Sequence, residues 1–350
     1  MKILLEAPFN SLSLGNVSYN FFRELMKKGH DVAIWPSGKV DIAAFNPPEE
    51  LKQQIQHGIN ERYAFLNSDI PAIKVWHLNG AENRKNEKQF LYTFYECNQP
   101  TKVEQTLSDA QTQTFFSSSC AAGMFGGLFI PLGFDSDFHV TPEKHLEGVV
   151  HFGLMGKFEH RKHTSKIIKT WLKKYGNNPK YQLSCLIHNP FYKADQMRAQ
   201  ITAILGGEHY SNINFLPFLE TNEEVNEFLN AVDIDLTGLS GAEGWNLPSF
   251  NATCLGKWSV VLNKTSHIDW ATCENSILVP SSGEVSAYDE IFFKKGSMFN
   301  QGTFYDWDED TVISAMELAE KKVGHINQDG LILGKEMTYS NTVDQILKYL

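Results

Sequence analysis

Cysteine is scarce in this 350-residue chain and follows no pairing pattern. The five cysteines are odd in number and widely scattered, and no two of them form a C-x-x-C pair. Such a set is more typical of a reduced cytosolic protein than of a disulfide scaffold. We therefore expect free thiols at Cys97, Cys120, Cys185, Cys254 and Cys273.

The chain also lacks a hydrophobic run long enough to cross a membrane. Its longest apolar stretch, at 121–134, is rich in glycine and is interrupted by Pro131. A spanning helix needs about 20 apolar residues. The first residues, MKILLEAPF, reach an acidic side chain too early for a signal peptide. We expect no integral membrane segment, a cytoplasmic location, and only peripheral contact with any membrane.

An excess of positive charge is absent as well. The net charge of −10 argues weakly against a broad nucleic-acid surface, although a local basic groove is compatible with it. Hydrophobic residues make up 42% of the chain and charged residues 21%, which is typical of a globular protein. The length favours two domains, because one core rarely serves so long a chain.

Short apolar runs alternate with amphipathic segments, which is the pattern of parallel α/β domains. The first half opens with a strand at 2–8, a polar loop at 9–18, a helix at 19–29 and a strand at 31–36. A second unit begins near 148 with a strand, a glycine-containing loop and a helix. We expect further strands at 71–80, 113–119, 181–190 and 213–220, a helix leading into a strand at 222–240, a linker at 131–145, and a C-terminal helix opening at about Glu309 or Asp310.

Four stretches, in order along the chain, carry a resemblance to a known family. They are SLGNVSYNFFRELMKKGHDV (13–32), YTFYECNQP (92–100) followed by FFSSSCAAGMF and IPLGFDSDFH (115–139), GLMGKFEHRKHTSKII (153–168), and GAEGWNLPSFNATCLGKWSVV (241–261). Together they resemble the GT-B glycosyltransferases, in particular the retaining "glycosyl transferases group 1", which includes glycogen-synthase-like and sucrose-synthase-like enzymes. The resemblance implies two Rossmann-like α/β domains facing each other across a cleft. It places an acceptor-side domain at 1–138, a nucleotide-sugar domain at 139–330, and a last helix at 331–350 that returns to the first domain.

A basic pair follows Gly156. Lys157 and Lys162 stand five positions apart, as a basic pair does in the family, with Arg161 as a neighbouring candidate. A nucleotide-sugar donor loses a diphosphate, so preorganised cations aimed at the leaving group lower the barrier. The family's first position is usually Arg, and Lys supplies a point charge without a bidentate fork. A solvated basic helix start is the structural alternative.

An acidic residue, Glu243, stands in a loop of small residues. By the resemblance it orients the donor sugar, while Gly241, Ala242 and Gly244 let backbone amides approach the sugar and phosphates. Asn251, eight positions later, replaces the family's second acid, which accepts bonds from the ribose. An amide accepts more weakly than a carboxylate, so Asn251 either keeps one ribose contact or only packs in a helix.

Other residues are assigned to the site by the same resemblance. Gly15 is assigned to the donor phosphates, Asn16, Ser18 and Glu96 to the acceptor, and His77 to the sugar or the acceptor. For His77 and Glu96 a structural role explains the residue about as well. Further donor contacts are expected from Trp245, Asn246, Leu247, His188 and Pro217, and His267 is a weaker candidate.

Candidate metal ligands are present but incomplete. Glu159, His160 and His163 have helical spacing without a third ligand of known spacing elsewhere. Asp233 and Asp235 imitate an Asp-x-Asp motif but open a strand, and GT-B enzymes generally do not use that motif. We therefore expect no metal and no cofactor, and we expect the aromatic residues at 291–307 to pack rather than to stack on sugars.

The leading hypothesis is a retaining, metal-independent glycosyltransferase. Its donor would be a nucleotide-diphosphate sugar, UDP- or GDP-linked, and its acceptor a glycan or other hydroxyl. One alternative is a viral-type enzyme that glycosylates modified DNA bases, and another is a non-catalytic module that binds a nucleotide or a glycan. The early basic and histidine residues that a GT-B epimerase needs are not evident.

Overall fold

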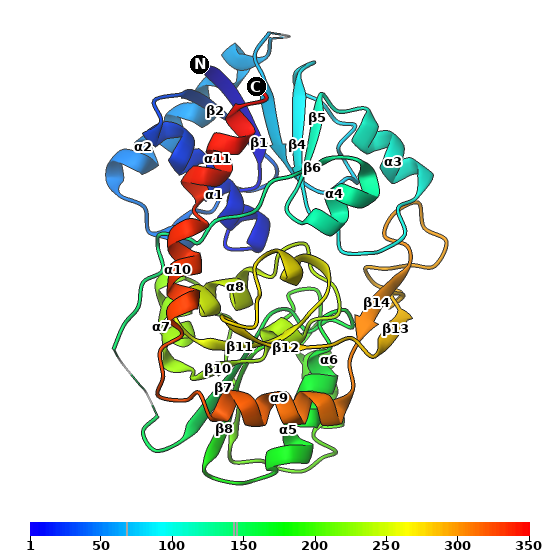
Figure 1. The fold of residues 1–350 in the computed structure, drawn as a ribbon. Coiled ribbons are helices and arrows are strands. Elements are labelled where there is room, and N and C mark those ends of the chain that lie inside the picture. The colour runs from blue at the N-terminus through cyan, green and yellow to red at the C-terminus, as the bar shows by residue number, and fades with distance from the viewer. Residues whose placement is uncertain (68, 143, 145) are drawn as a thin grey trace.

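The chain forms two α/β domains that lie one above the other in Figure 1, each built on a six-stranded sheet. The computed structural model describes residues 1–67, 69–142, 144 and 146–350. All strand pairs in both sheets are parallel. The expected class of two Rossmann-like domains is confirmed. Two positions of the expected linker, 143 and 145, lie outside the described residues.

The first sheet has the strand order β2-β1-β3-β4-β5-β6. Its strands are β1 (Lys2–Ala7), β2 (Asp31–Pro36), β3 (Ala72–Val75), β4 (Gln89–Thr93), β5 (Gln113–Phe116) and β6 (Leu128–Phe129). Its helices are α1 (Ser13–Lys27), α2 (Glu49–Glu61), α3 (Lys102–Asp109) and α4 (Ser119–Phe125). The expected strands at 2–8, 31–36, 71–80 and 113–119 are confirmed.

The expectation of a loop up to residue 18 is wrong, because α1 already begins at Ser13. Gly15 fits inside this helix since the chain at Asn10 crosses it closely; a Cβ on Gly15 would lie 2.1 Å from the Asn10 carbonyl oxygen. Ser18 fits because its hydroxyl donates to the Leu14 carbonyl one turn back, at 2.7 Å. Residues that look like loop formers are therefore accommodated in a helix by local contacts.

The second sheet has the order β12-β11-β10-β7-β8-β9. Its strands are β7 (Val150–Met155), β8 (Tyr181–Leu186), β9 (Ile213–Phe215), β10 (Ile234–Asp235), β11 (Trp258–Leu262) and β12 (Ser276–Val279). Its helices are α5 (Thr164–Tyr175), α6 (Ala194–Ile204), α7 (Asn222–Ala231), α8 (Leu247–Cys254) and α9 (Glu309–Glu320). The expected start of the helix at 309 is confirmed.

An antiparallel hairpin, β13 (Gly283–Ser286) and β14 (Thr303–Asp306), extends from the second domain toward the first. Asn98, after β4, donates to the Thr303 hydroxyl at 2.7 Å and accepts from the Thr303 amide at 2.9 Å. Gln99 and Gln301 add a backbone bridge. The hairpin thus links the two domains on one side.

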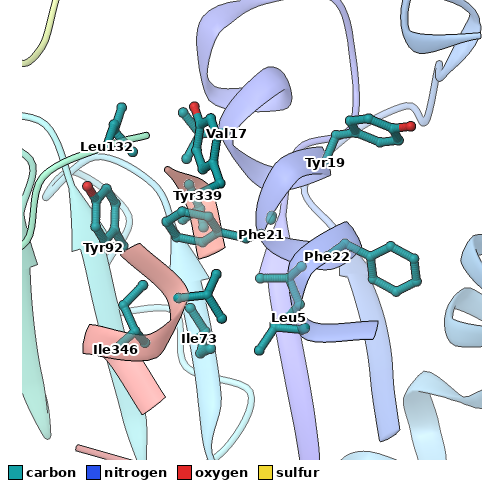
Figure 2. Close-up of a cluster of buried hydrophobic side chains, with 14 of the residues drawn as sticks. Leu5, Val17, Tyr19, Phe21, Phe22, Ile73, Tyr92, Leu132, Tyr339 and Ile346 are labelled. Atoms are coloured by element: carbon teal, nitrogen blue, oxygen red, sulfur yellow. The ribbon is translucent and has the colours of Figure 1, made fainter. Parts of the chain in front are cut away.

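The last two helices, α10 (Gln328–Glu336) and α11 (Tyr339–Leu347), run back from the second domain to the first (Figure 1). Figure 2 shows Tyr339 and Ile346 within the hydrophobic core of the first domain, near Phe21 and Tyr92. The Phe21 ring meets the Tyr92 ring edge-to-face at 5.0 Å and the Tyr339 ring at 6.1 Å. The first domain's core is therefore completed by the end of the chain.

All five cysteines are free thiols. Among the described residues, no helix combines the length and apolar character needed to cross a membrane.

Candidate active site between the two domains

Glu243 is the centre of a buried charge network between the sheets. It lies in the loop before α8 and is 5% exposed. One carboxylate oxygen is 2.5 Å from Lys162 Nζ and the other is 2.8 Å from an Arg161 guanidinium nitrogen. Burial by itself would raise the pKa of Glu243, but the charges of Arg161 and Lys162 outweigh burial and hold that pKa below its usual range. Glu243 is therefore ionised and fixed in orientation.

Arg161 holds three carboxylates at once. Besides Glu243 it contacts Glu159 at 3.1 Å and Glu96 at 3.2 Å, and it donates to the Ala242 carbonyl at 2.5 Å. Its own side chain is 6% exposed. Arg161 thus bonds to several protein groups, whereas the neighbouring Lys162 makes one ion pair among the described residues.

Lys157 is the more exposed of the expected basic pair. Its Nζ lies 3.1 Å from Glu159 and within 6 Å of two ring centroids, those of Phe191 and Phe292. Burial opposes the ionisation of Glu159, but Arg161, Lys157 and Lys162 together lower its pKa. Gly156 has φ of +138°, and a Cβ there would lie 3.1 Å from Lys162 Cδ. Glycine at 156 therefore leaves room for the Lys162 side chain.

The glycines of the Glu243 loop have close neighbours. A Cβ on Gly241 would lie 2.5 Å from His163 Nε2 and from the Tyr305 carbonyl oxygen. A Cβ on Gly244 would lie 2.8 Å from Phe94 Cβ in the first domain. The Gly244 carbonyl also accepts from the Ser117 hydroxyl at 2.6 Å. Their expected role in approaching a donor stays a prediction; the structure adds a packing role for each.

The residues after Gly244 support the loop from beneath. Trp245 is 2% exposed and packs against Phe250, so its indole belongs to the core. Asn246 has φ of +68°, a left-handed conformation that Asn tolerates. Its amide donates to the Thr237 carbonyl and to His267 Nε2, both at 3.0 Å. His267 is fully buried and bonds the Leu262 carbonyl through Nδ1 at 2.9 Å, so it anchors this loop.

A cavity of about 540 Å³ opens beside this network. Glu96 lies in its wall and connects it to Arg161. Burial raises the pKa of Glu96; the Arg161 charge opposes this, and the charges of Glu243 and Glu159 add to it. Both domains form the wall, which consists of Glu96, Cys97, Asn98, Cys120, Met124, Asn263, Lys264, Thr265, Ile268, Thr303 and Tyr305.

A second cavity, of about 140 Å³, adjoins the start of α8. Its wall includes Asn16 of α1, Leu247 and Asn251 of α8, Met155 just before Gly156, and the segment 219–222. Asn251 is 6% exposed, and its side-chain oxygen is buried with no hydrogen-bond partner among the described residues. A buried acceptor without a donor is costly, so this oxygen is suited to a ligand hydroxyl.

Other expected residues lie outside both cavities. Ser18 is fully buried, and its hydroxyl is bonded within α1. His188 and Pro217 are exposed in the loops after β8 and β9. His77 is exposed in the loop after β3. Desolvation, then the charges of Lys157 and Arg161, lower its pKa. The structure therefore does not gather all of the expected residues around one point.

The candidate metal ligands bond to protein groups instead. His160 and His163 approach the carbonyls of Ser286 and Tyr305, at 3.1 and 2.8 Å. Asp235 accepts from the Ser249 hydroxyl, and Asp233 pairs with Lys144. Within the described residues no group of three His, Cys, Asp or Glu side chains is arranged to hold a metal ion.

Several residues of the site were missed from the sequence. The sequence suggests Glu159 only as a metal ligand, although its position between Lys157 and Arg161 also indicates charge pairing. Lys264 and the segment 219–222 carry no motif that identifies them. His267 was expected at most to touch the donor, whereas it holds Asn246.

Comparison with solved structures identifies the architecture. Sucrose-phosphate synthase from Thermosynechococcus elongatus matches with a TM-score of 0.70 at 12% identity, covering 99% of this chain and 98% of its own. Anabaena HepE in complex with UDP-glucose matches at 0.66 and 15%, and apo OtsA at 0.66 and 11%, each with the same coverage. No family model and no curated protein sequence matches the chain. The protein therefore has the GT-B fold, with two Rossmann-like domains facing each other across the site.

Proposed function

We propose that this protein is a retaining, metal-independent glycosyltransferase that moves a sugar from a nucleotide-diphosphate donor to a hydroxyl acceptor. The observation that carries the proposal is the ionised Glu243, which Lys162 and Arg161 hold where the two domains of a GT-B fold meet. The likeness to HepE, solved with UDP-glucose and with UDP and glucose, supports a UDP-linked donor, and GDP is the other candidate.

The nucleoside would occupy the second cavity, where the Asn251 oxygen lacks a partner. The diphosphate would then lie toward Lys162, with Lys157 nearby, and toward the amides at the start of α8. Glu243 would accept hydroxyl groups of the donor sugar. In this arrangement each part of the donor would meet the charge or hydrogen-bond partner that its chemistry needs.

The acceptor would enter through the first cavity, whose wall contains Glu96. During transfer the bond between the sugar's anomeric carbon and the β-phosphate oxygen breaks. A bond to the acceptor oxygen forms on the same face, and the acceptor proton passes to the departing phosphate. Lys162 stabilises the negative charge that develops there, and the closed domains exclude water as a competing acceptor. A glycan or polysaccharide is the proposed acceptor class, and the cytoplasm the proposed location.

The donor is found by a thermal-shift screen against UDP-, GDP-, ADP-, CDP- and TDP-sugars, because a bound donor stabilises the fold by mass action. With that donor, Lys162→Ala and Glu243→Ala should each lower turnover by about 100-fold or more. Lys169→Ala, which removes an exposed lysine from α5, is the matched control. Wild-type rates of hydrolysis and transfer in both site variants would refute the assignment. NMR of the product's anomeric proton reports retention or inversion.

The two alternatives give different results in the same experiments. An enzyme acting on DNA bases would bind duplex DNA with a steep loss of affinity as salt rises. A binding module would bind nucleotide tightly and turn over no donor.

A further inference from the structure

Arg161 occupies a place in the network that donor binding alone does not require. It stands one residue before Lys162, yet its guanidinium is enclosed by Glu96, Glu159 and Glu243. The Ala242 carbonyl takes a further bond from it. Both terminal nitrogens of Arg161 are directed at these protein groups, and its Nε is buried without a partner among the described residues. The ends of the guanidinium that could meet a diphosphate are therefore already paired.

Glu96 and Glu243 belong to different domains. Glu96 follows β4 of the first sheet, and Glu243 precedes α8 of the second. The same guanidinium nitrogen of Arg161 reaches both carboxylates, at 3.2 and 2.8 Å. The direction in which Arg161 holds Glu243 therefore depends on where the first domain places Glu96.

The second partner of Glu243 is the one that a donor would recruit. Lys162 Nζ is 2.5 Å from one Glu243 oxygen, and its side chain is more exposed than that of Arg161, at 13% against 6%. A diphosphate that draws Lys162 away leaves Glu243 with Arg161 alone. Without Arg161, the buried carboxylate of Glu243 would then be unpaired, which is strongly unfavourable.

We propose that Arg161 and Glu96 are positioning residues that aim Glu243 at the donor sugar only when the two domains are closed. Arg161 holds the Glu243 carboxylate after Lys162 turns to the diphosphate, and Glu96 fixes Arg161 from the opposite domain. Closure and the orientation of the sugar are thereby coupled through one side chain. This inference rests on the proposed function.

The test compares Glu96→Gln, which removes the charge but keeps the size, with Ser119→Ala. Ser119 and Asp269 form another hydrogen-bonded contact between the domains, one that does not involve Arg161, so this variant is the matched control. With UDP-glucose as substrate, Glu96→Gln should lower kcat about 10-fold or more while the Kd for UDP changes less than 2-fold. Ser119→Ala should leave kcat within 2-fold. Equal effects of the two variants on kcat, or a parallel loss of UDP affinity, would overturn the inference.

A second measurement needs no donor. In the unliganded protein, the amides at 241–246 should exchange hydrogen faster in Glu96→Gln but not in Ser119→Ala. Both altered residues lie in the first domain, so the difference reports the contact with Arg161. In a double-mutant cycle, the effects of Glu96→Gln and Arg161→Lys on these exchange rates should be non-additive, because the two residues act through one contact. Unchanged exchange together with additivity would overturn the inference. If the wild-type protein turns over no nucleotide sugar, the proposed function fails, and the exchange experiment still decides the coupling.

Discussion

Gly244 sets the distance between the two domains beside Glu243. A Cβ at this position would lie 2.8 Å from Phe94 Cβ, 3.2 Å from its Cδ1 and 3.4 Å from its Cα. Carbon atoms in contact prefer about 3.5–4.0 Å, so Gly244→Ala must separate these segments by roughly 1 Å. Rotation of the Phe94 ring gives no relief, because Cβ does not move with it. A misplacement of about 1 Å costs catalysis up to about 100-fold.

We therefore expect Gly244→Ala to lower donor turnover by about 10- to 100-fold with little change in UDP affinity. Gly123→Ala in α4, where a Cβ meets nothing within 4 Å, is the control and should keep full activity. Turnover by coupled assay and UDP binding by calorimetry give the two numbers. Wild-type turnover in Gly244→Ala, or a crystal structure with the Phe94 contact at its present separation, would refute this reasoning.

Three further predictions concern charge and pH. Burial lowers the pKa of His267 from 6.5 to about 4. The contribution of neutral His267 to stability is therefore present above pH 6.5, and about 3 kcal/mol is lost as pH falls toward 4. His267→Gln should flatten this part of the pH dependence of the free energy of unfolding, measured by chemical unfolding. Glu243→Gln leaves Arg161 and Lys162 with less counter-charge and should lower the free energy of unfolding at pH 7 by about 3 kcal/mol. Because the folded pKa of Glu243 is depressed, this deficit should shrink as pH falls below 4.5, and a constant deficit would contradict the pairing. Asn251→Glu should raise UDP affinity about 10-fold by offering two acceptor oxygens, whereas unchanged or weaker binding measured by calorimetry would place the ribose elsewhere.

The sequence predicted most strands because buried parallel strands are continuous apolar runs. It did not predict the start of α1, because Gly15 and Ser18 are poor helix formers whose compensating contacts come from Asn10 and Leu14. The hairpin β13–β14 is not predicted from the sequence, which indicates only packing for the aromatic residues at 291–307, a range that contains β14. Its pairing depends on the loop between the strands, which carries no short turn signal.

Residue types along the sequence predict the motif around Glu243, but they do not predict the directions in which its side chains point. Adjacent residues Arg161 and Lys162 look equivalent in sequence, yet one is enclosed by carboxylates and the other has one. Trp245 looks like a ligand contact but lies in the core. Such differences arise from tertiary packing, which the spacing of charges along the chain does not encode.

The return of α11 to the first domain has a mechanical consequence. The chain crosses between the domains near Phe134 and again near Thr338, and these two residues form a parallel bridge. At this point the crossings touch so closely that a Cβ on Gly133 would lie 2.0 Å from the Tyr339 nitrogen. Two chain segments paired side by side should resist sliding and twisting of the domains more than a single linker does, and should leave rotation about the paired segments as the easiest motion. Each opening and closing of the site should therefore bring Glu96 back to Arg161 along the same path.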